Sequence, residues 1–419
     1  MTNPRFALVA FGLLATACSA VRPAADSGTV TSVWVELGPG GSAQVRAITE
    51  ATGCPTLLVD GGARPMQIRA SADGGSFPVT VCEAPLPAGA RSAAVAGHPV
   101  PVPMPFPRRI LVVGDTGCRM EAPSDFQACN DGAAWPFANV AARAAAWKPN
   151  LVIHVGDFHY RESPCPSGNA GCAGNPAGDT WASWRADFFA PAAPLLGAAP
   201  WIFIRGNHEV CSRAGEGWFR FLEPRARPAT CTDDAEPYLI PLGVAVLAVI
   251  DSSPASDTKA DPEDVARYAA QLDRLAAMTP AYTWLVTHRP VWSVVNIGQP
   301  MLATGNKTLQ TAIPGRLPAT VTLLLAGHVH LFEALSFAGG RPPSMVVGNG
   351  GTELDAAITQ PVVGLDLDGA TVTSAKTLRA FGYVTMEPAG ADWRATVHGV
   401  DGGVVTECTL ARRALTCAP

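Results

Sequence analysis

Five apolar runs of the sequence each end, after a glycine or threonine, on a residue that can bind a metal. They are ILVVGD, ending on Asp115, LVIHVGD on Asp157, WIFIRGN on Asn207, WLVTH on His288 and LLLAGH on His328. Two more side chains of this kind follow closely, Tyr160 after Asp157 and His330 after His328. Short apolar runs bounded by turn residues are typical of buried strands. We therefore expect metal-ligand residues at the ends of five strands.

These side chains are expected to meet in one crevice, because ligands of open α/β sheets bind beyond the carboxyl ends of the strands. His328 and His330 are two residues apart on an extended segment, so both can face the same pocket. Carboxylate and phenolate oxygens combined with imidazoles suit iron, zinc or manganese. The donors are too many for one ion. If Asp157 bridges, two metals can lie about 3.5 to 4 Å apart.

The elements that must position these residues alternate between strands and helices from residue 108 onward. Helical stretches are expected at 133–147, 180–196 and 262–278. Strands with helical connections imply a largely parallel, buried sheet covered by helices. Residues 28–98 instead hold short β-rich runs separated by Gly, Pro and Asp, which predict a small all-β sandwich domain. The proline-rich segment 99–107 is expected to be a linker, and residues from about 361 to 419 a C-terminal β cap on the 108–419 domain.

Composition limits the class of protein and of partner. The chain has 419 residues, of which 48% are hydrophobic and 16% charged, as in a globular protein with more than one domain. Its formal net charge of −5 provides no basic field for nucleic acid or anionic lipid. A small anionic substrate must therefore be attracted locally, for example by bound metal.

Residues 1–20 are typical of an export signal. Arg5 is followed by an apolar run from Phe6 to Ala17, and two interpretations stay open: cleavage of a signal peptide, or a lipoprotein anchored through lipid on Cys18, which we favour slightly. The protein is then periplasmic, attached to the outer membrane or cell surface, or secreted. Ten cysteines remain, an even number that predicts disulfides in an exported chain. Pairing nearest neighbours would give five local bridges, although the sequence leaves the connectivity open.

The ordered blocks GDTG (114–117), GDFHY (156–160), GNHE (206–209), VTH (286–288) and GHVH (327–330) resemble the five blocks of the purple acid phosphatases, a family of calcineurin-like metallophosphoesterases. The resemblance covers roughly residues 108–350. Gly117 stands where most of the superfamily has histidine, and Tyr160 supplies a ligand instead. The resemblance implies an α/β metallophosphoesterase fold, a β-sheet core with flanking helices. A fibronectin-III-like β-sandwich before it is similar to larger family members.

The resemblance also implies which residues bind which metal. A ferric ion would take Asp115, Asp157, Tyr160 and His330, and a divalent zinc, manganese or iron would take Asp157, Asn207, His288 and His328. His208 would contact the phosphate or protonate the leaving oxygen without binding metal. The implied enzyme is an acid phosphatase that hydrolyses phosphate monoesters of small molecules by attack of a metal-bound hydroxide.

Two alternative functions and several residue assignments stay open. A phosphodiesterase or nucleotidase would use the same ligands, and a cell-surface binding lipoprotein would use the β-sandwich while the second domain is inert. Among the other histidines, His154 is expected in the core, whereas His98, His159 and His398 are expected to be exposed. Arg289 could bind substrate or pair with a carboxylate. The Gly- and Pro-rich stretch 161–179 is the predicted rim of the site.

Overall fold

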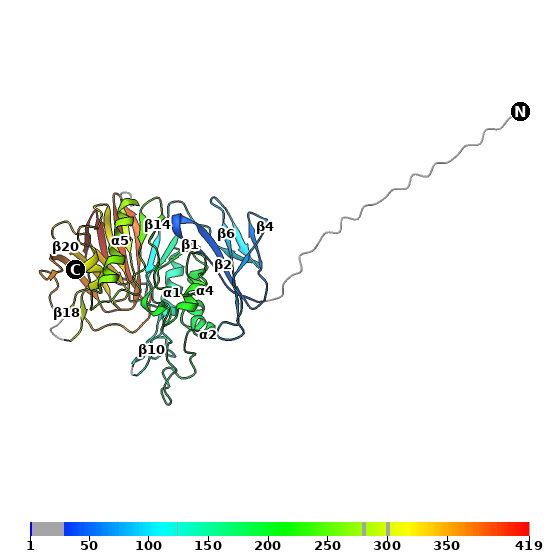
Figure 1. Cartoon of the computed structure of the whole chain (residues 1–419), viewed down its shortest axis with the longest axis horizontal. Coiled ribbons are helices and arrows are strands. Elements are labelled where there is room, and N and C mark those ends of the chain that lie inside the picture. The colour runs from blue at the N-terminus through cyan, green and yellow to red at the C-terminus, as the bar shows by residue number, and fades with distance from the viewer. Residues whose placement is uncertain (2–28, 124, 279–281, 299–301, 419) are drawn as a thin grey trace.

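Two large β-sheets packed face to face form the centre of the computed structural model, which describes residues 1, 29–123, 125–278, 282–298 and 302–418. The first sheet has eleven strands in the order β27-β26-β25-β24-β9-β12-β13-β1-β2-β6-β5. The second has eight, in the order β14-β15-β16-β19-β21-β20-β23-β22. Helices cover their outer faces (Figure 1).

Parallel strands occupy the middle of both sheets. In the first sheet they are β9 (Ile110–Val113), β12 (Leu151–His154) and β13 (Trp201–Phe203). In the second they are β15 (Val246–Val249), β16 (Thr283–Val286), β19 (Val321–Ala326) and β21 (Ser344–Val347). Antiparallel strands flank this second set: β14 (Tyr238–Pro241), β20 (Phe332–Phe337), β22 (Asp366–Leu367) and β23 (Ala370–Leu378).

The expected fold class, a β-sheet core with flanking helices, is confirmed, but the single largely parallel sheet is wrong: there are two mixed sheets. Strand β9 explains both results. Ile110 and Val112 face the second sheet, while Leu111 and Val113 face the helices. A strand buried on both faces reads as an unbroken apolar run whatever covers each face. The sequence therefore indicates buried strands without indicating that half of them belong to another sheet.

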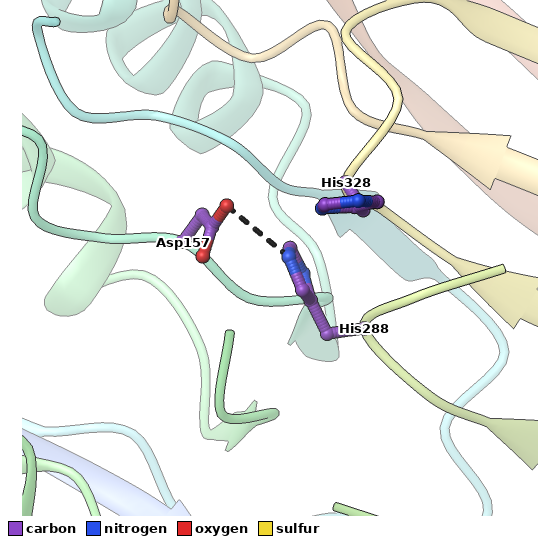
Figure 2. A group of neighbouring side chains, drawn as sticks. All are labelled: Asp157, His288 and His328. Atoms are coloured by element: carbon purple, nitrogen blue, oxygen red, sulfur yellow. Dashed lines mark ion pairs between the residues drawn. The ribbon is translucent and has the colours of Figure 1, made fainter. Parts of the chain in front are cut away.

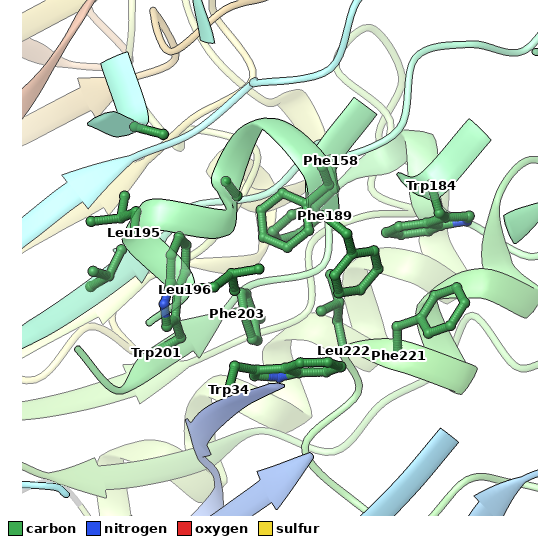
Figure 3. Packing of buried hydrophobic residues seen from close by; sticks show 14 of the residues in the cluster. Trp34, Phe158, Trp184, Phe189, Leu195, Leu196, Trp201, Phe203, Phe221 and Leu222 are labelled. Carbon is green, nitrogen blue, oxygen red and sulfur yellow. The ribbon is translucent and has the colours of Figure 1, made fainter. Parts of the chain in front are cut away.

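Helices cover the outer face of each sheet. The first group is α1 (Phe137–Ala146), α2 (Trp181–Trp184), the π-helix η2 (Arg185–Phe189), α3 (Ala190–Leu196) and α4 (Gly215–Phe221). The second is α5 (Pro262–Met278) and α6 (Lys307–Ala312). Aromatic side chains fill the first interface (Figure 3), where Trp34 of β1 lies with its ring centroid 5.3 Å from that of Phe189. The N-terminal strand thus shares a core with the helices.

The N-terminal segment forms two β layers, one of which continues the first sheet. Its elements are β1 (Val30–Leu37), η1 (Pro39–Gly41), β2 (Ala43–Thr49), β3 (Thr56–Val59), β4 (Gly62–Pro65), β5 (Gln67–Ala70), β6 (Thr80–Leu86), β7 (Ala93–Val95) and β8 (His98–Val100). A four-stranded sheet, β4-β3-β7-β8, packs over β1, β2 and β6 around a separate apolar cluster. Strand β1 pairs in parallel with β13, at Glu36 and Trp201. The division at residues 99–107 stays a proposal.

The C-terminal strands extend the other side of the first sheet. They are β24 (Gly382–Ala389), β25 (Asp392–Gly399), β26 (Val404–Ala411) and β27 (Ala414–Cys417), joined through an antiparallel pairing of β24 with β9. The remaining short elements are β10 (Met120–Glu121), β11 (Asp125–Phe126), β17 (Val295–Asn296), β18 (Leu302–Ala303) and the 3-10 turn η3 (Asn207–Glu209).

Five disulfides each join one cysteine to the next cysteine along the chain, which confirms the expected local pairing. They are Cys54–Cys82, Cys118–Cys129, Cys165–Cys172, Cys211–Cys231 and Cys408–Cys417. No helix among the described residues has the length and apolar character needed to cross a bilayer. The predicted export signal and Cys18 lie outside the described residues, because 2–28 are not among them.

Candidate metal centre

The five predicted strand ends meet at one edge of the paired sheets. Asp115, Asp157 and Asn207 follow β9, β12 and β13 of the first sheet, while His288 and His328 follow β16 and β19 of the second. Backbone hydrogen bonds tie these loops together: the amide of Asp115 donates to Gly156 O at 2.9 Å, and the amide of Gly327 donates to His288 O at 2.9 Å. Each sheet therefore contributes part of one site.

The first group of side chains gathers around the Tyr160 hydroxyl. Its oxygen lies 2.7 Å from Asp157 Oδ2, 2.8 Å from His330 Nε2 and 3.4 Å from Asp115 Oδ1. All four side chains are buried. Four donor atoms this close, from four different side chains, could surround a single cation.

The second group contains Asp157 again, with Asn207, His288 and His328. Figure 2 shows His288 directed at Asp157, with Nε2 3.1 Å from Oδ2, and the His328 ring beside it. The same Nε2 lies 3.0 Å from Asn207 Oδ1. His288 Nδ1 lies 2.8 Å from the Val155 carbonyl, which can only accept, so Nδ1 carries the proton and the Nε2 lone pair points inward. Asp157, His288 and His328 can place one ligand atom each within 4.8 Å of one another.

The charge of the centre fits a cation. Asp115 is 0% exposed and Asp157 1%, and among the described residues neither carboxylate pairs with a lysine or arginine. Buried carboxylates are costly unless they are paired or bind metal. Burial raises the pKa of Asp115, whereas for Asp157 burial is outweighed by His288 and His208, which lower its pKa. Burial and the two carboxylates raise the pKa of Tyr160. A bound cation would supply the positive charge that these buried carboxylates lack.

The backbone is strained at three of these residues. Asp115, Asp157 and His328 have φ of 54°, 59° and 71°, in the left-handed region that non-glycine residues rarely adopt. Such conformations cost roughly 1 to 3 kcal/mol each and gather at functional sites. The glycine before Asn207 has a steric reason: a Cβ on Gly206 would collide with the Asp157 carboxyl group.

Two buried carboxylates that the sequence analysis did not single out hold the ligand loops. Glu209 accepts hydrogen bonds from the amides of Gly206, Asp157, Phe158 and His159, at 2.8 to 3.2 Å. Asp187 accepts from the amides of Cys118, Tyr160 and Arg161 and from the guanidinium of Arg161, at 2.5 to 3.1 Å. Glu209 lies within the GNHE block, so the sequence already places it close to the candidate ligand Asn207. Asp187 lies in a helical stretch with no motif around it.

His208 lies on the Tyr160 side of the centre and belongs to neither of the two groups of candidate ligands. Its ring centroid is 3.7 Å from that of Tyr160, and its Nε2 is 3.9 Å from Asp157 Oδ2. Its Nδ1 lies 2.7 Å from Glu162 Oε1, and Arg213 Nη2 lies 2.6 Å from the same oxygen. Burial lowers the pKa of His208 to about 4, against the opposing charges of Asp157 and Glu162.

Another carboxylate, that of Asp257, holds His328 in position. Its Oδ2 lies 3.0 Å from His328 Nε2, its Oδ1 accepts from Asn306 Nδ2 at 2.8 Å, and it pairs closely with Arg289. No hydrogen bond to His328 Nδ1 forms among the described residues, so this nitrogen remains for a metal. Of the two alternatives for Arg289, the structure supports pairing with a carboxylate.

The centre opens into a cavity of about 330 Å³. The candidate metal ligands Asp157, Tyr160, Asn207, His328 and His330 line it, and so does His208. Apolar residues of the β17–β18 hairpin line the cavity too, among them Val295 and Ala303. The volume suits a small molecule.

The other histidines follow the sequence expectations in two of four cases. His154 is buried in the core, where its ring stacks on that of Phe158 with the ring centroids 3.9 Å apart, and His98 is exposed. The expected exposure of His159 and His398 is wrong. His159 is 1% exposed and its Nε2 lies 3.0 Å from Gly178 O, while His398 is 8% exposed, with Nε2 2.9 Å from Thr385 Oγ1. Each imidazole has a polar partner, Gly178 O for His159 and Thr385 Oγ1 for His398, which permits its burial.

Comparison with known proteins agrees with this geometry. Residues 108–332 match the family model of the calcineurin-like phosphoesterases. Among solved structures, the purple acid phosphatase PPD1 from yellow lupin (Lupinus luteus) seeds is similar in fold, with a TM-score of 0.61 and 14% identity over 93% of this chain and 75% of that one. The structure of PhoD has a TM-score of 0.55 and 12% identity over 93% and 92%. Curated proteins gave no match.

The matched segment covers more than half of the sequence and contains all five blocks in full, the last of them, GHVH, just before its end. It begins just before β9 and ends at the start of β20, so it spans both halves of the site. At their low identity, the two solved structures support the fold alone. The chain belongs to the calcineurin-like phosphoesterase family.

Proposed function

We propose that the protein is a dinuclear-metal phosphatase that hydrolyses phosphate monoesters of small molecules. One observation carries this proposal: a single oxygen, Asp157 Oδ2, lies 2.7 Å from the Tyr160 hydroxyl in one group and 3.1 Å from His288 Nε2 in the other. An oxygen shared between two sets of ligands is the arrangement expected of a bridging carboxylate. Two-metal phosphate enzymes hold their ions about 3.5 to 4 Å apart.

The ligand assignments follow the two groups. Asp115, Asp157, Tyr160 and His330 would hold a ferric ion, because a phenolate favours a trivalent metal, and Asp157, Asn207, His288 and His328 would hold zinc, manganese or ferrous iron. When bound, the two cations would supply charge that neutralises phosphate and activates water.

The remaining roles belong to side chains around the cavity. Glu209 and Asp187 keep the ligand loops in place through seven backbone amides. His208 presents Nε2 to the cavity because Glu162, whose lowered pKa keeps it ionised, accepts the hydrogen bond that Nδ1–H donates. It would contact a phosphate oxygen or the leaving oxygen.

Export is part of the proposal. Five disulfides are typical of proteins that fold in an oxidising compartment. We propose a leader in residues 1–20 and, for a lipoprotein, lipid on Cys18. Mass spectrometry of the mature protein separates the two forms, since a lipid adds mass to a chain that begins at Cys18.

The function is tested with an aryl phosphate and the matching aryl diester, after purified protein has been loaded with iron and a divalent metal. Hydrolysis of the monoester at a higher kcat/KM than the diester supports the proposal, and the reverse order would make the protein a phosphodiesterase. Asp157→Ala should abolish either activity while circular dichroism stays unchanged. A metal-loaded, folded wild type that hydrolyses neither ester would point to the binding lipoprotein instead.

A further inference from the structure

Arg119 places a guanidinium at the wall of the cavity, next to Tyr160. It follows the first block by two residues, and its guanidinium carbon lies 5.5 Å from the centroid of the Tyr160 ring. It lines the same cavity as Tyr160, His208 and His330. Of the described residues that line this cavity, Arg119 is the single arginine or lysine.

The donors of Arg119 are largely unused. Its Nε is buried and has no hydrogen-bond partner within the described part of the chain. Its Nη1 lies 4.0 Å from Asp125 Oδ2, at the outer limit of an ion pair, and the side chain of Asp125 is 57% exposed. Exposed ion pairs of this kind contribute little. A guanidinium in a cavity with unpaired donors is suited to a planar or tetrahedral oxyanion.

Other arginines near the site are engaged by close carboxylates. Arg161 contacts Asp187 at 2.5 Å, Arg213 contacts Glu162 at 2.6 Å, and Arg289 pairs with Asp257. These three hold the surroundings of the ligands in place. Within the described part of the chain, the carboxylate paired with Arg119 is that of Asp125, at 4.0 Å. The backbone of Arg119 is nevertheless fixed, with its amide donating to Gln127 Oε1 at 3.1 Å and its carbonyl accepting from the amide of Gln127 at 2.8 Å. A fixed backbone therefore holds a cation with free donors.

We propose that Arg119 binds a non-bridging phosphate oxygen of the substrate and thereby favours dianionic monoesters over monoanionic diesters. The inference rests on the proposed function and adds to it a residue outside the metal-ligand blocks. A monoester has one more terminal oxygen and one more negative charge than its diester, so a guanidinium stabilises it more. The same contact would hold inorganic phosphate, the product.

The test compares Arg119→Met and Arg119→Lys with wild type and with Arg394→Met. This matched control removes an arginine of β25 that has a half-exposed side chain, pairs with Glu387 of β24 and does not line the cavity. Metal content and the visible spectrum are measured first, because a merely structural role of Arg119 over Tyr160 would change them. Two quantities are then measured: the inhibition constant of inorganic phosphate, and kcat/KM for an aryl phosphate and its diester.

We expect Arg119→Met to keep both metals, to raise the inhibition constant of phosphate roughly 10- to 100-fold and to lower kcat/KM for the monoester by a similar factor, as for loss of a charge-assisted hydrogen bond. The diester should lose less, Arg119→Lys should recover part of the loss, and Arg394→Met should match wild type. Unchanged phosphate inhibition, equal losses for both esters, or loss of metal in Arg119→Met would each overturn the inference. If wild type hydrolyses no ester at all, the proposed function fails, and phosphate binding to the metal-loaded protein, measured by calorimetry, still decides the role of Arg119.

Discussion

Replacing Asp257 by asparagine should weaken the proposed divalent site while leaving the proposed ferric site intact. Asp257 contacts the outer nitrogen of one proposed ligand, His328, at 3.0 Å, and contacts none of the ligands proposed for iron. Burial acts to raise the pKa of Asp257, but the hydrogen bond and charge of His328 and the charge of Arg289 outweigh it and hold this pKa below its ordinary value. The carboxylate is thus ionised and can accept a hydrogen bond from Nε2–H of His328, which leaves the Nδ1 lone pair for the metal.

Arg289 makes the protonation state of His328 decisive. Its Nη1 lies 2.9 Å from His328 Nε2, and both cannot be donors in one hydrogen bond. If Nε2 accepted from Arg289, Nδ1 would carry the proton and could not bind metal. The negative charge of Asp257 selects the competent form, whereas a neutral asparagine does not. Loss of such a partner typically costs 10- to 100-fold in metal affinity, or about 1.4 to 2.8 kcal/mol.

The assay is competition between the protein and a chelator for zinc or manganese, after iron has been loaded. Asp257→Asn should bind the divalent ion roughly 10- to 100-fold more weakly than wild type and keep the visible band of the iron–tyrosinate pair. Asp273→Asn is the matched control, because Asp273 is exposed and pairs with Arg316 on the surface. Equal affinity in Asp257→Asn and wild type would refute the reasoning, as would a simultaneous loss of the visible band.

Three further predictions follow from buried groups. Arg46→Met should lower the free energy of unfolding in urea by about 3 to 5 kcal/mol, because Arg46 is fully buried, pairs with Glu36 at 2.8 Å and donates to the carbonyls of Phe221 and Glu223 at the C-terminal end of α4; a loss below 1 kcal/mol would contradict this. Gly206→Ala should abolish metal binding at Asp157 in a folded protein, whereas exposed Gly40→Ala should cost only stability. Burial raises the pKa of Glu333 to about 8, so its protonated form is favoured on folding; stability should fall by several kcal/mol as pH rises from 4.5 through 8, and Glu333→Gln should flatten that fall.

The gathering of the proposed metal ligands could be predicted because these residues occupy the ends of buried strands. Asp115, Asp157 and Asn207 each follow an apolar run after a glycine, and parallel strands of one sheet end at one edge. The glycine itself has a physical cause at position 206, where a side chain would strike Asp157. Short sequence patterns therefore suffice to locate most residues of the candidate site.

The supporting residues could not be predicted, because their partners are remote in sequence and their own surroundings are ordinary. Asp187 lies in a helical stretch yet holds the backbone at Cys118 and Tyr160, and Asp257 lies in a loop yet holds His328. The buried His159 is a similar case, since its partner Gly178 belongs to the Gly- and Pro-rich loop. Side chains of these types are usually exposed, and only the folded chain shows the contacts that bury them.

The two-sheet architecture was missed for a related reason. An apolar strand is compatible with a helix or with another sheet on either face, so Ile110 and Leu111 look alike in sequence although they enter different cores. The pairing of β1 with β13 adds a second example, because no pattern in residues 30–37 indicates a neighbour near residue 201.

Elemental analysis of the purified, metal-loaded protein together with its visible spectrum tests the central claim most directly. We predict two metal ions per chain, at least one of them iron, and a broad absorption band that disappears in Tyr160→Phe while circular dichroism is unchanged. A wild-type protein that retains fewer than two ions, or a band that persists in Tyr160→Phe, would contradict the assignment of Tyr160 and the groups around Asp157 to a dinuclear centre.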